Sequence, residues 1–97
     1  MRMRDVRVDT DVDGALDDAR AGWARVDDAW EMIEWVLMRD PTVGEPLTES
    51  GTSRTFVFAG SITHEMPDIQ VIYVFDENYI TIKSVRFGAP SYSAGTA

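Results

Sequence analysis

The stretch IQVIYVFDENYITIKSVRF, residues 69–87, decides the fold class of this 97-residue chain. Two runs rich in β-branched and aromatic residues flank a polar triplet at positions 76–78, which is typical of a β-hairpin with a short loop. The first run is apolar on both sides, because its odd positions are all apolar and its even positions place Ile72 and Val74 beside Gln70. A strand of this kind usually lies in the middle of a sheet, so the hairpin predicts further strands.

Two of these strands are predicted outside the hairpin. The run SRTFVFAG, residues 53–60, is rich in Phe, Val and Thr and follows a loop rich in Pro, Gly, Thr and Ser. Near the N-terminus Val6 and Val8 alternate with charged residues, which predicts a short strand at a sheet edge. An antiparallel sheet is therefore expected over residues 53–87, with one more strand within residues 1–9.

A helical segment is predicted between these strands, over residues 14–39. Apolar side chains recur there at spacings of three and four residues, as in an amphipathic helix: Leu16, Ala19, Trp23, Val26, Trp30, Ile33 and Leu37. Gly22 interrupts the stripe and Asp27 or Asp28 could cap a new helix, so one kinked helix and two helices in a tight hairpin both remain open. Pro41 ends the segment, because a residue before proline disfavours helical geometry.

These elements predict an α+β fold in one domain, residues 1–97. We expect a small antiparallel sheet of three to four strands, with a helix or helical hairpin packed on one face. The C-terminal residues 88–97, GAPSYSAGTA, are small and polar and are expected to fray.

One stretch resembles part of a calcium-binding loop. Asp9, Asp11, Asp13 and Gly14 match the pattern D-x-D-x-D-G, but the twelfth position, which must supply a bidentate carboxylate, is Arg20. We therefore interpret these aspartates as an acidic helix start, with Asp13 or a neighbour as the N-cap.

Composition limits the partners and the chemistry. The net charge of −8 and the sequence pI near 4.4 argue against direct binding to free nucleic acid, which needs clustered Lys and Arg. A basic protein is the better partner for such a chain. There is no cysteine, and no metal-ligand or phosphate-binding motif is found, so no cofactor is expected. No apolar run is long enough to span a membrane and the N-terminus is charged, so we expect a cytoplasmic protein without membrane attachment.

Two side-chain types are candidates for contact or chemistry. Trp23 and Trp30 lie on the apolar stripe and are predicted to pack in the core, whereas Trp35 lies off it and is a candidate contact residue. An apolar strand together with Trp35 makes a homodimer plausible. His64, the only histidine, lies beside Glu65 in a predicted loop; we interpret it as a surface residue whose neighbouring carboxylate leaves an acid/base role open.

The order strand, helices, loop and three strands resembles the RelE/ParE toxin superfamily of toxin-antitoxin systems. The similar segments are LMRDPTVGEPL at residues 37–47, SRTFVFAG at residues 53–60 and the hairpin at residues 69–87. The resemblance implies helices on one face of a small sheet. It also implies a type II toxin that binds an antitoxin protein and acts on translation at the ribosome, as an mRNA endonuclease, or on gyrase.

The resemblance also implies site residues. The strand-entrance cation would be Arg54, and the cation at the end of the last strand would be Arg86. The candidates for proton transfer would be Tyr73, His64 and Glu65. Nuclease members often place an arginine three positions before the strand tyrosine, and here that residue is Gln70. Because glutamine brings no charge, this departure argues against cleavage of RNA.

Two alternative functions without catalysis follow, one on the face opposite the helices and one on the helices. An antitoxin segment could bind there through Gln70, Ile72 and Val74. In the other class of function, the protein is a non-catalytic acidic inhibitor that mimics nucleic acid, with acidic side chains along the helices: Asp17, Asp18, Asp27, Asp28, Glu31 and Glu34. Convergence of Arg54 and Arg86 within about 6–8 Å would favour catalysis, because one phosphate could then bridge them.

Overall fold

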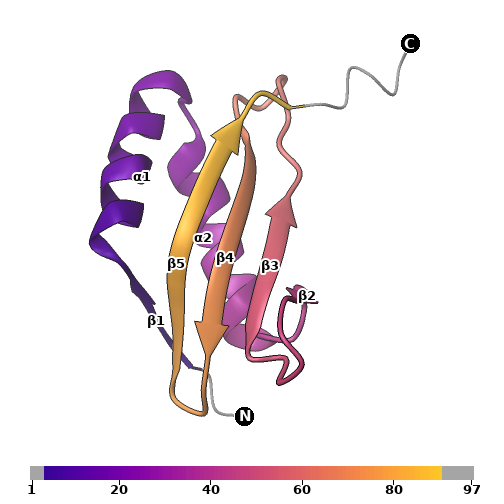
Figure 1. The fold of residues 1–97 in the computed structure, drawn as a ribbon. Helices are drawn as coiled ribbons and strands as arrows, with labels where there is room; N and C mark the ends of the chain where they lie inside the picture. Colours follow the sequence, from indigo (N-terminus) through magenta and orange to yellow (C-terminus); the bar gives the residue numbers. More distant parts are fainter. Residues whose placement is uncertain (1–3, 91–97) are drawn as a thin grey trace.

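The computed structural model describes residues 4–90, and it is an α+β fold (Figure 1). The elements along the chain are β1 (Asp5–Val8), α1 (Thr10–Gly22), α2 (Val26–Arg39), β2 (Glu45–Pro46), β3 (Ser53–Phe58), β4 (Asp68–Phe75) and β5 (Tyr79–Gly88). The strands form one five-stranded sheet in the order β1-β5-β4-β3-β2. Both helices lie on one face of it, which confirms the predicted fold class.

The hairpin of β4 and β5 forms the centre of the sheet. β4 lies between β5 and β3 and is antiparallel to both, as its apolar faces predicted. β1, at the edge of the sheet, pairs with β5 in parallel. The sheet is therefore mixed and has five strands, where an antiparallel sheet of three to four was predicted. The additional strand is the two-residue β2, within a segment predicted as a loop.

A β-bulge in β5 lets both halves of this strand contribute to the core. Tyr73 pairs with Ile82, but Ile72 pairs with Ser84, so Lys83 is an extra residue without an opposite partner. Ile82 and Val85 consequently face the same side of the sheet although one is at an even and the other at an odd position. The change of apolar parity within the sequence TIKSVRF is the signature of this bulge.

The helical segment forms two helices, which settles the alternative left open by the sequence. α1 ends at Gly22 and α2 begins at Val26. The first helix begins at Thr10, earlier than the expected residue 14, so the stretch resembling a calcium loop is helical. Asp9 occupies the N-cap position, but its carboxylate makes no capping hydrogen bond and instead pairs with Lys83 at 3.2 Å. Of the aspartates considered for the N-cap, Asp9 and not Asp13 occupies the position, and it does so without the expected side-chain hydrogen bond.

The core lies between the helices and the sheet. It contains apolar residues of α1, α2, β4 and β5 that are at most 8% exposed: Val12, Leu16, Ala19, Val26, Ala29, Trp30, Ile33, Leu37, Ile69, Val71, Tyr73, Ile80 and Ile82. Trp23 is half-buried and packs against this core, as predicted, whereas Trp35 is 52% exposed. The helical stripe and the strand alternation thus meet in one apolar layer. The predicted C-terminal tail lies almost entirely outside the described residues.

The turn between β4 and β5 is held by Asp76. Its Oδ1 accepts hydrogen bonds from the backbone N–H groups of Asn78 and Tyr79, each at 2.8 Å. These two bonds favour the charged form of the carboxyl and so hold the pKa of Asp76 below its usual range. The bond from Asn78 has the larger effect on the pKa.

Replacing Asp76 with alanine is expected to lower Tm at neutral pH. A depressed pKa in the folded state means that the contribution of Asp76 is present above the pKa of the unfolded chain and is lost as pH falls through the folded-state pKa. The difference in Tm between wild type and D76A should therefore be constant near neutral pH and narrow as pH falls below about 4. Thermal unfolding followed by circular dichroism from pH 7 to pH 3 measures this, with E77A as the control. A difference that stays constant with pH would contradict it.

Candidate functional site

The face of the sheet opposite the helices is uncovered in the described part of the chain, and we call it the open face. The strand register places Gln70 there beside Val57 and Arg86, and Ile72 beside Thr55 and Ser84. The alternation also brings Val74 to this face. Val57 is 62% and Val74 is 37% exposed, while Ile72 is half-buried. Three residues predicted to bind a partner, Gln70, Ile72 and Val74, therefore lie together.

A concavity of about 250 Å³ lies on the open face, where the bulge bends β5. It is lined by Gln70, Ile72, Ser84 and Arg86. The Gln70 Nε2 donates to the Thr55 hydroxyl at 3.3 Å, and this hydroxyl donates to a strand carbonyl, so the amide is held in place. Ser84 was not predicted as a site residue; the parity change that marks the bulge would have assigned it to this face.

The side chains that line this concavity can bind a ligand through ionic, hydrogen-bonding and apolar contacts. Within residues 4–90, Arg86 makes no ion pair or hydrogen bond, so its guanidinium is free to bind a carboxylate or a phosphate oxygen of a ligand. Gln70 and Ser84 add neutral hydrogen-bonding groups, and Ile72 adds an apolar wall. None of these four side chains is a general base at neutral pH.

Arg54 lies on the other face of the sheet, because it pairs with the buried Tyr73 whereas Arg86 pairs with Gln70. The Arg54 guanidinium donates to three backbone carbonyls of the preceding loop, those of Thr42, Gly44 and Gly51, at 2.7–3.0 Å. The structure thus does not bring Arg54 and Arg86 together. The role that the contacts give to Arg54 is to hold the loop of residues 40–52 against β3.

Replacing Arg54 with lysine is expected to reduce the free energy of unfolding by about 1 kcal/mol. The three carbonyls are bound by two separate nitrogens of the planar guanidinium, and the single nitrogen of a lysine cannot reach all of them. Urea denaturation measures this. R86K is the matched control and should change stability by less than about 0.5 kcal/mol, since Arg86 is exposed. Equal losses in the two variants would contradict the assignment of Arg54 to the loop.

The Tyr73 hydroxyl is buried and satisfied. It donates to the Pro41 carbonyl at 2.6 Å and accepts from the Gly44 N–H at 3.1 Å. Burial raises the pKa of Tyr73 above its ordinary value, and the Gly44 N–H opposes this to a smaller extent. The hydroxyl thus donates its hydrogen bond to a backbone carbonyl and lies on the side of the sheet away from the open face. Its two hydrogen bonds hold the loop of residues 40–52 in place.

His64 lies in the connection between β3 and β4, at the opposite end of the sheet from the β4–β5 turn (Figure 1). It is exposed, and its Nδ1 is 3.0 Å from the Ser61 hydroxyl. Tyr73 and Arg54 lie toward the other end of β4, beside the loop of residues 40–52. Four of the residues considered for catalysis, Arg54, Arg86, Tyr73 and His64, are therefore distributed over two faces and two ends of the sheet.

Comparison with known protein families, curated proteins and solved structures gives no match. The function has to be inferred from the surfaces of the molecule. Within residues 4–90 no group of three or more His, Cys, Asp or Glu side chains is placed to hold a metal ion. Neither of the two helices in this part of the chain is long and apolar enough to cross a membrane.

Three of the six acidic residues predicted to form an acidic helix face pair with arginine: Asp17, Asp27 and Asp28. Arg20 of α1 pairs with Asp17 and, at 2.8 Å, with Asp27 of α2, which ties the two helices together. Arg25 pairs with Asp28 at 2.9 Å. These exposed ion pairs reduce the net negative charge along the helices.

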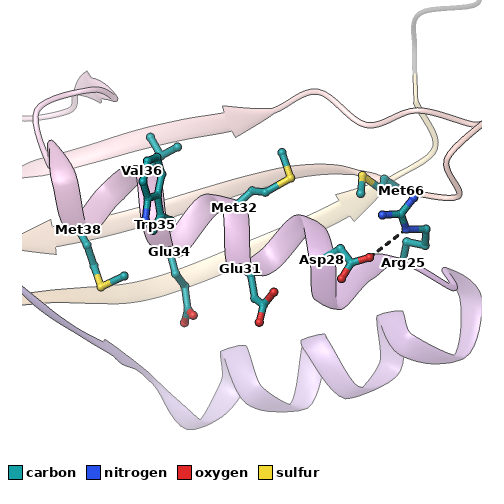
Figure 2. Close-up of a pocket in the computed structure, with 9 residues that line it drawn as sticks. All are labelled: Arg25, Asp28, Glu31, Met32, Glu34, Trp35, Val36, Met38 and Met66. Atoms are coloured by element: carbon teal, nitrogen blue, oxygen red, sulfur yellow. Dashed lines mark hydrogen bonds and ion pairs between the residues drawn. The ribbon is translucent and has the colours of Figure 1, made fainter.

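Glu34 of α2 is different from the other acidic residues because it is half-buried. Burial raises the pKa of the Glu34 carboxyl, while the hydrogen bond from the Trp30 Nε1, at 3.2 Å, opposes this. Trp35, the predicted contact residue, lines the same pocket on α2 as Glu34 but points to the other side of the helix, away from α1 (Figure 2). The molecule therefore presents two separate surfaces for partners.

Proposed function

We propose that this protein is the toxin-like, protein-binding component of a two-gene toxin-antitoxin module, acting by binding at its open face. The observation that carries this proposal is the composition of that face. Exposed Val57 and Val74 and half-buried Ile72 lie around a polar concavity with Arg86, which has no ion-pair partner within residues 4–90. Aliphatic side chains around one free cation suit a peptide segment with apolar residues and a carboxylate. An antitoxin segment that crosses the open face is the proposed partner.

Binding is favoured over catalysis by the placement of the cations. An RNA nuclease needs positive charge at the phosphate, and here Arg54 is bonded to loop carbonyls. On the open face Arg86 pairs across the strands with uncharged Gln70, and Arg7 of β1, opposite Thr81, is stacked on the Tyr79 ring. The target proposed from the resemblance is gyrase or the ribosome, and for an acidic protein it is reached by protein contacts. The proposed compartment is the cytoplasm, where both targets are found.

The order of the elements supports the RelE/ParE-like scaffold that the proposal uses. A strand, two helices and three long strands follow each other along the chain, and the helices cover one face only. The order of the elements and the helices on one face agree with what the resemblance implies, whereas the five-stranded mixed sheet differs from the implied antiparallel sheet of three or four strands. The resemblance supports a partner-binding role. The position of the binding surface is inferred only from the exposed residues of the open face.

The test is expression with and without the product of the adjacent short open reading frame. We expect growth arrest without it, relief of the arrest with it, and a complex that copurifies. Cells that grow normally in both cases, together with no copurification, would overturn the proposal.

V57D should weaken this complex at least about tenfold, because a charge would be placed in an apolar contact. I62D is the matched control, since Ile62 is 52% exposed in the β3–β4 connection and away from the open face. Isothermal titration calorimetry measures both. Equal weakening by V57D and I62D would assign the partner to another surface.

A cleavage assay separates binding from catalysis. Translating ribosomes incubated with the protein should give no new mRNA ends by primer extension. New ends that disappear with R86A would show that Arg86 contacts a scissile phosphate and would overturn the binding mechanism.

A second candidate is a non-catalytic inhibitor that mimics nucleic acid, favoured by the net charge of −8. Asp18 and Glu31 are exposed on the helices, and within residues 4–90 they have no arginine partner of the kind that Asp17, Asp27 and Asp28 have. Binding to a basic protein that weakens steeply between 50 and 300 mM salt, and that E31K reduces, would identify this function. Its surface is that of the helices, so V57D would leave such binding unchanged.

A further inference from the structure

The outer side of α2 carries a shallow hollow of about 770 Å³ that the proposed function does not use (Figure 2). Its apolar part consists of Met32, Trp35 and Val36 of α2 and Met66 of the β3–β4 connection. In Figure 2 the first three point to the same side of the helix, and Met66 lies near the beginning of α2. The helices separate this hollow from the open face of the sheet.

The apolar side chains of the hollow are unusually exposed. Met32 is 50% and Trp35 is 52% exposed, on a helix whose opposite side is fully buried at Ile33 and Leu37. Exposed Met and Trp side chains on one surface are typical of a protein contact, since methionine adapts its shape and tryptophan gives a large apolar area. These residues have no role in the core.

The backbone holds the two parts of the hollow together. The N–H of Arg25 donates to the carbonyl of Glu65 at 3.2 Å, which fixes the β3–β4 connection at the start of α2. Met66 is half-buried at this point. At the other end of α2 the Arg39 guanidinium stacks on the Trp35 ring, 4.4 Å from its centroid. These contacts hold the side chains at both ends of the hollow in place along α2.

The rim of the hollow is acidic. Asp28, Glu31 and Glu34 line it, and Figure 2 shows Glu31 and Glu34 on the side of α2 that faces α1. Arg25 neutralises Asp28 at 2.9 Å, which leaves Glu31 and Glu34 without a cation among the described residues. An apolar strip beside two unneutralised carboxylates selects a ligand with an apolar face and basic flanks.

We propose that this hollow binds an amphipathic helix of another protein, with leucine-like side chains on one face and Lys or Arg beside them. The 14 residues of α2 span about 21 Å, which matches a partner helix of about four turns. Its apolar residues at i, i+3 or i+4, and i+7 contact Met32, Trp35 and Met66, and its cations lie beside Glu31 and Glu34. A second copy of this chain is disfavoured as the occupant, because two molecules of charge −8 would bring like charges together.

The experiment uses a synthetic 18-residue peptide with a leucine stripe at helical spacing and lysines at the other positions. Two control peptides are needed: the same stripe with glutamates in place of the lysines, and the basic composition scrambled so that the stripe is lost. Fluorescence anisotropy at about 150 mM salt measures binding to the full chain. We expect the basic amphipathic peptide to bind at least about tenfold more tightly than either control.

Variants of the protein locate the peptide. W35A and M32A should each weaken binding of the basic peptide at least about fivefold, and E31K should weaken it while improving the glutamate peptide. V57A, an exposed apolar truncation on the open face, is the matched control and should leave binding unchanged. Circular dichroism on each variant checks that Tm is retained, which is expected because both Trp35 and Met32 are exposed.

Three results would overturn this proposal: equal binding of the lysine and glutamate peptides, binding that W35A leaves unchanged, and a dimer in sedimentation that W35A dissociates. The last result would assign the hollow to a second copy. The proposal is independent of the function proposed for the open face. Loss of antitoxin binding in V57D with normal peptide binding would separate the two surfaces, and the reverse pattern in W35A would do the same.

Discussion

Replacing Gly44 with alanine is expected to reduce the free energy of unfolding by about 3 kcal/mol. Gly44 is buried in the loop before β2, and a Cβ atom there would lie 2.4 Å from the Thr55 carbonyl oxygen and 2.8 Å from the Tyr73 hydroxyl. The Thr55 oxygen is a backbone atom of β3 opposite Glu45, so it cannot move without disturbing the β2–β3 pairing. The loop would have to leave the sheet.

Urea denaturation followed by tryptophan fluorescence measures this loss. The matched control is G14A: Gly14 is exposed in α1, and a Cβ there meets nothing within 4 Å. Because alanine is the better helix former, G14A should raise the free energy of unfolding by about 0.5–1 kcal/mol. The same substitution thus has opposite signs at the two positions. A loss below about 1 kcal/mol in G44A would show that the loop is not tightly held.

Replacing Tyr73 with phenylalanine is expected to cost about 2 kcal/mol, although only one oxygen is removed. The change leaves the Pro41 carbonyl and the Gly44 N–H without their buried partner. Y79F is the control, because the Tyr79 ring is 37% exposed and lies under the Arg7 guanidinium without a hydrogen bond from its hydroxyl within residues 4–90. That variant should change stability by less than about 0.5 kcal/mol.

The pH dependence of Y73F gives an independent check. Because the pKa of Tyr73 is raised in the folded protein, its contribution is present below the pKa of the unfolded chain and is lost as pH rises through the folded-state pKa. The stability gap between wild type and Y73F should therefore be constant near neutral pH and narrow as pH rises above about 10. A gap that is absent at pH 7 would contradict the structural role of this hydroxyl and return it to the list of residues available for chemistry.

Much of the fold was accessible from local sequence patterns. The two runs at residues 69–87 predicted the central hairpin, and the stripe from Leu16 to Leu37 predicted the helical layer, because side-chain periodicity is imposed by the backbone of each element itself. The position of β4 between two strands followed from its two apolar faces. The start of α1 at Thr10 was missed, since acidic residues occur both before and inside the first turn of a helix.

The candidate site was only partly accessible. Gln70, Ile72 and Val74 share a face because they alternate along one strand, and the sequence was sufficient to group them. The exposed Trp35 was found because it lies off the helical stripe. The hollow on α2 was not predicted, since Met66 reaches it from a different part of the chain.

The sequence by itself thus determined the type of each element and the sides that it presents to the core. Only the tertiary structure decided that Arg54 and Arg86 lie on opposite faces, because this depends on the strand register and on the bulge at Lys83. It also decided that the Tyr73 hydroxyl binds Pro41, a residue 32 positions earlier. Periodicity is a local property of the backbone, whereas register and long-range hydrogen bonds are chosen by the packing of the whole chain.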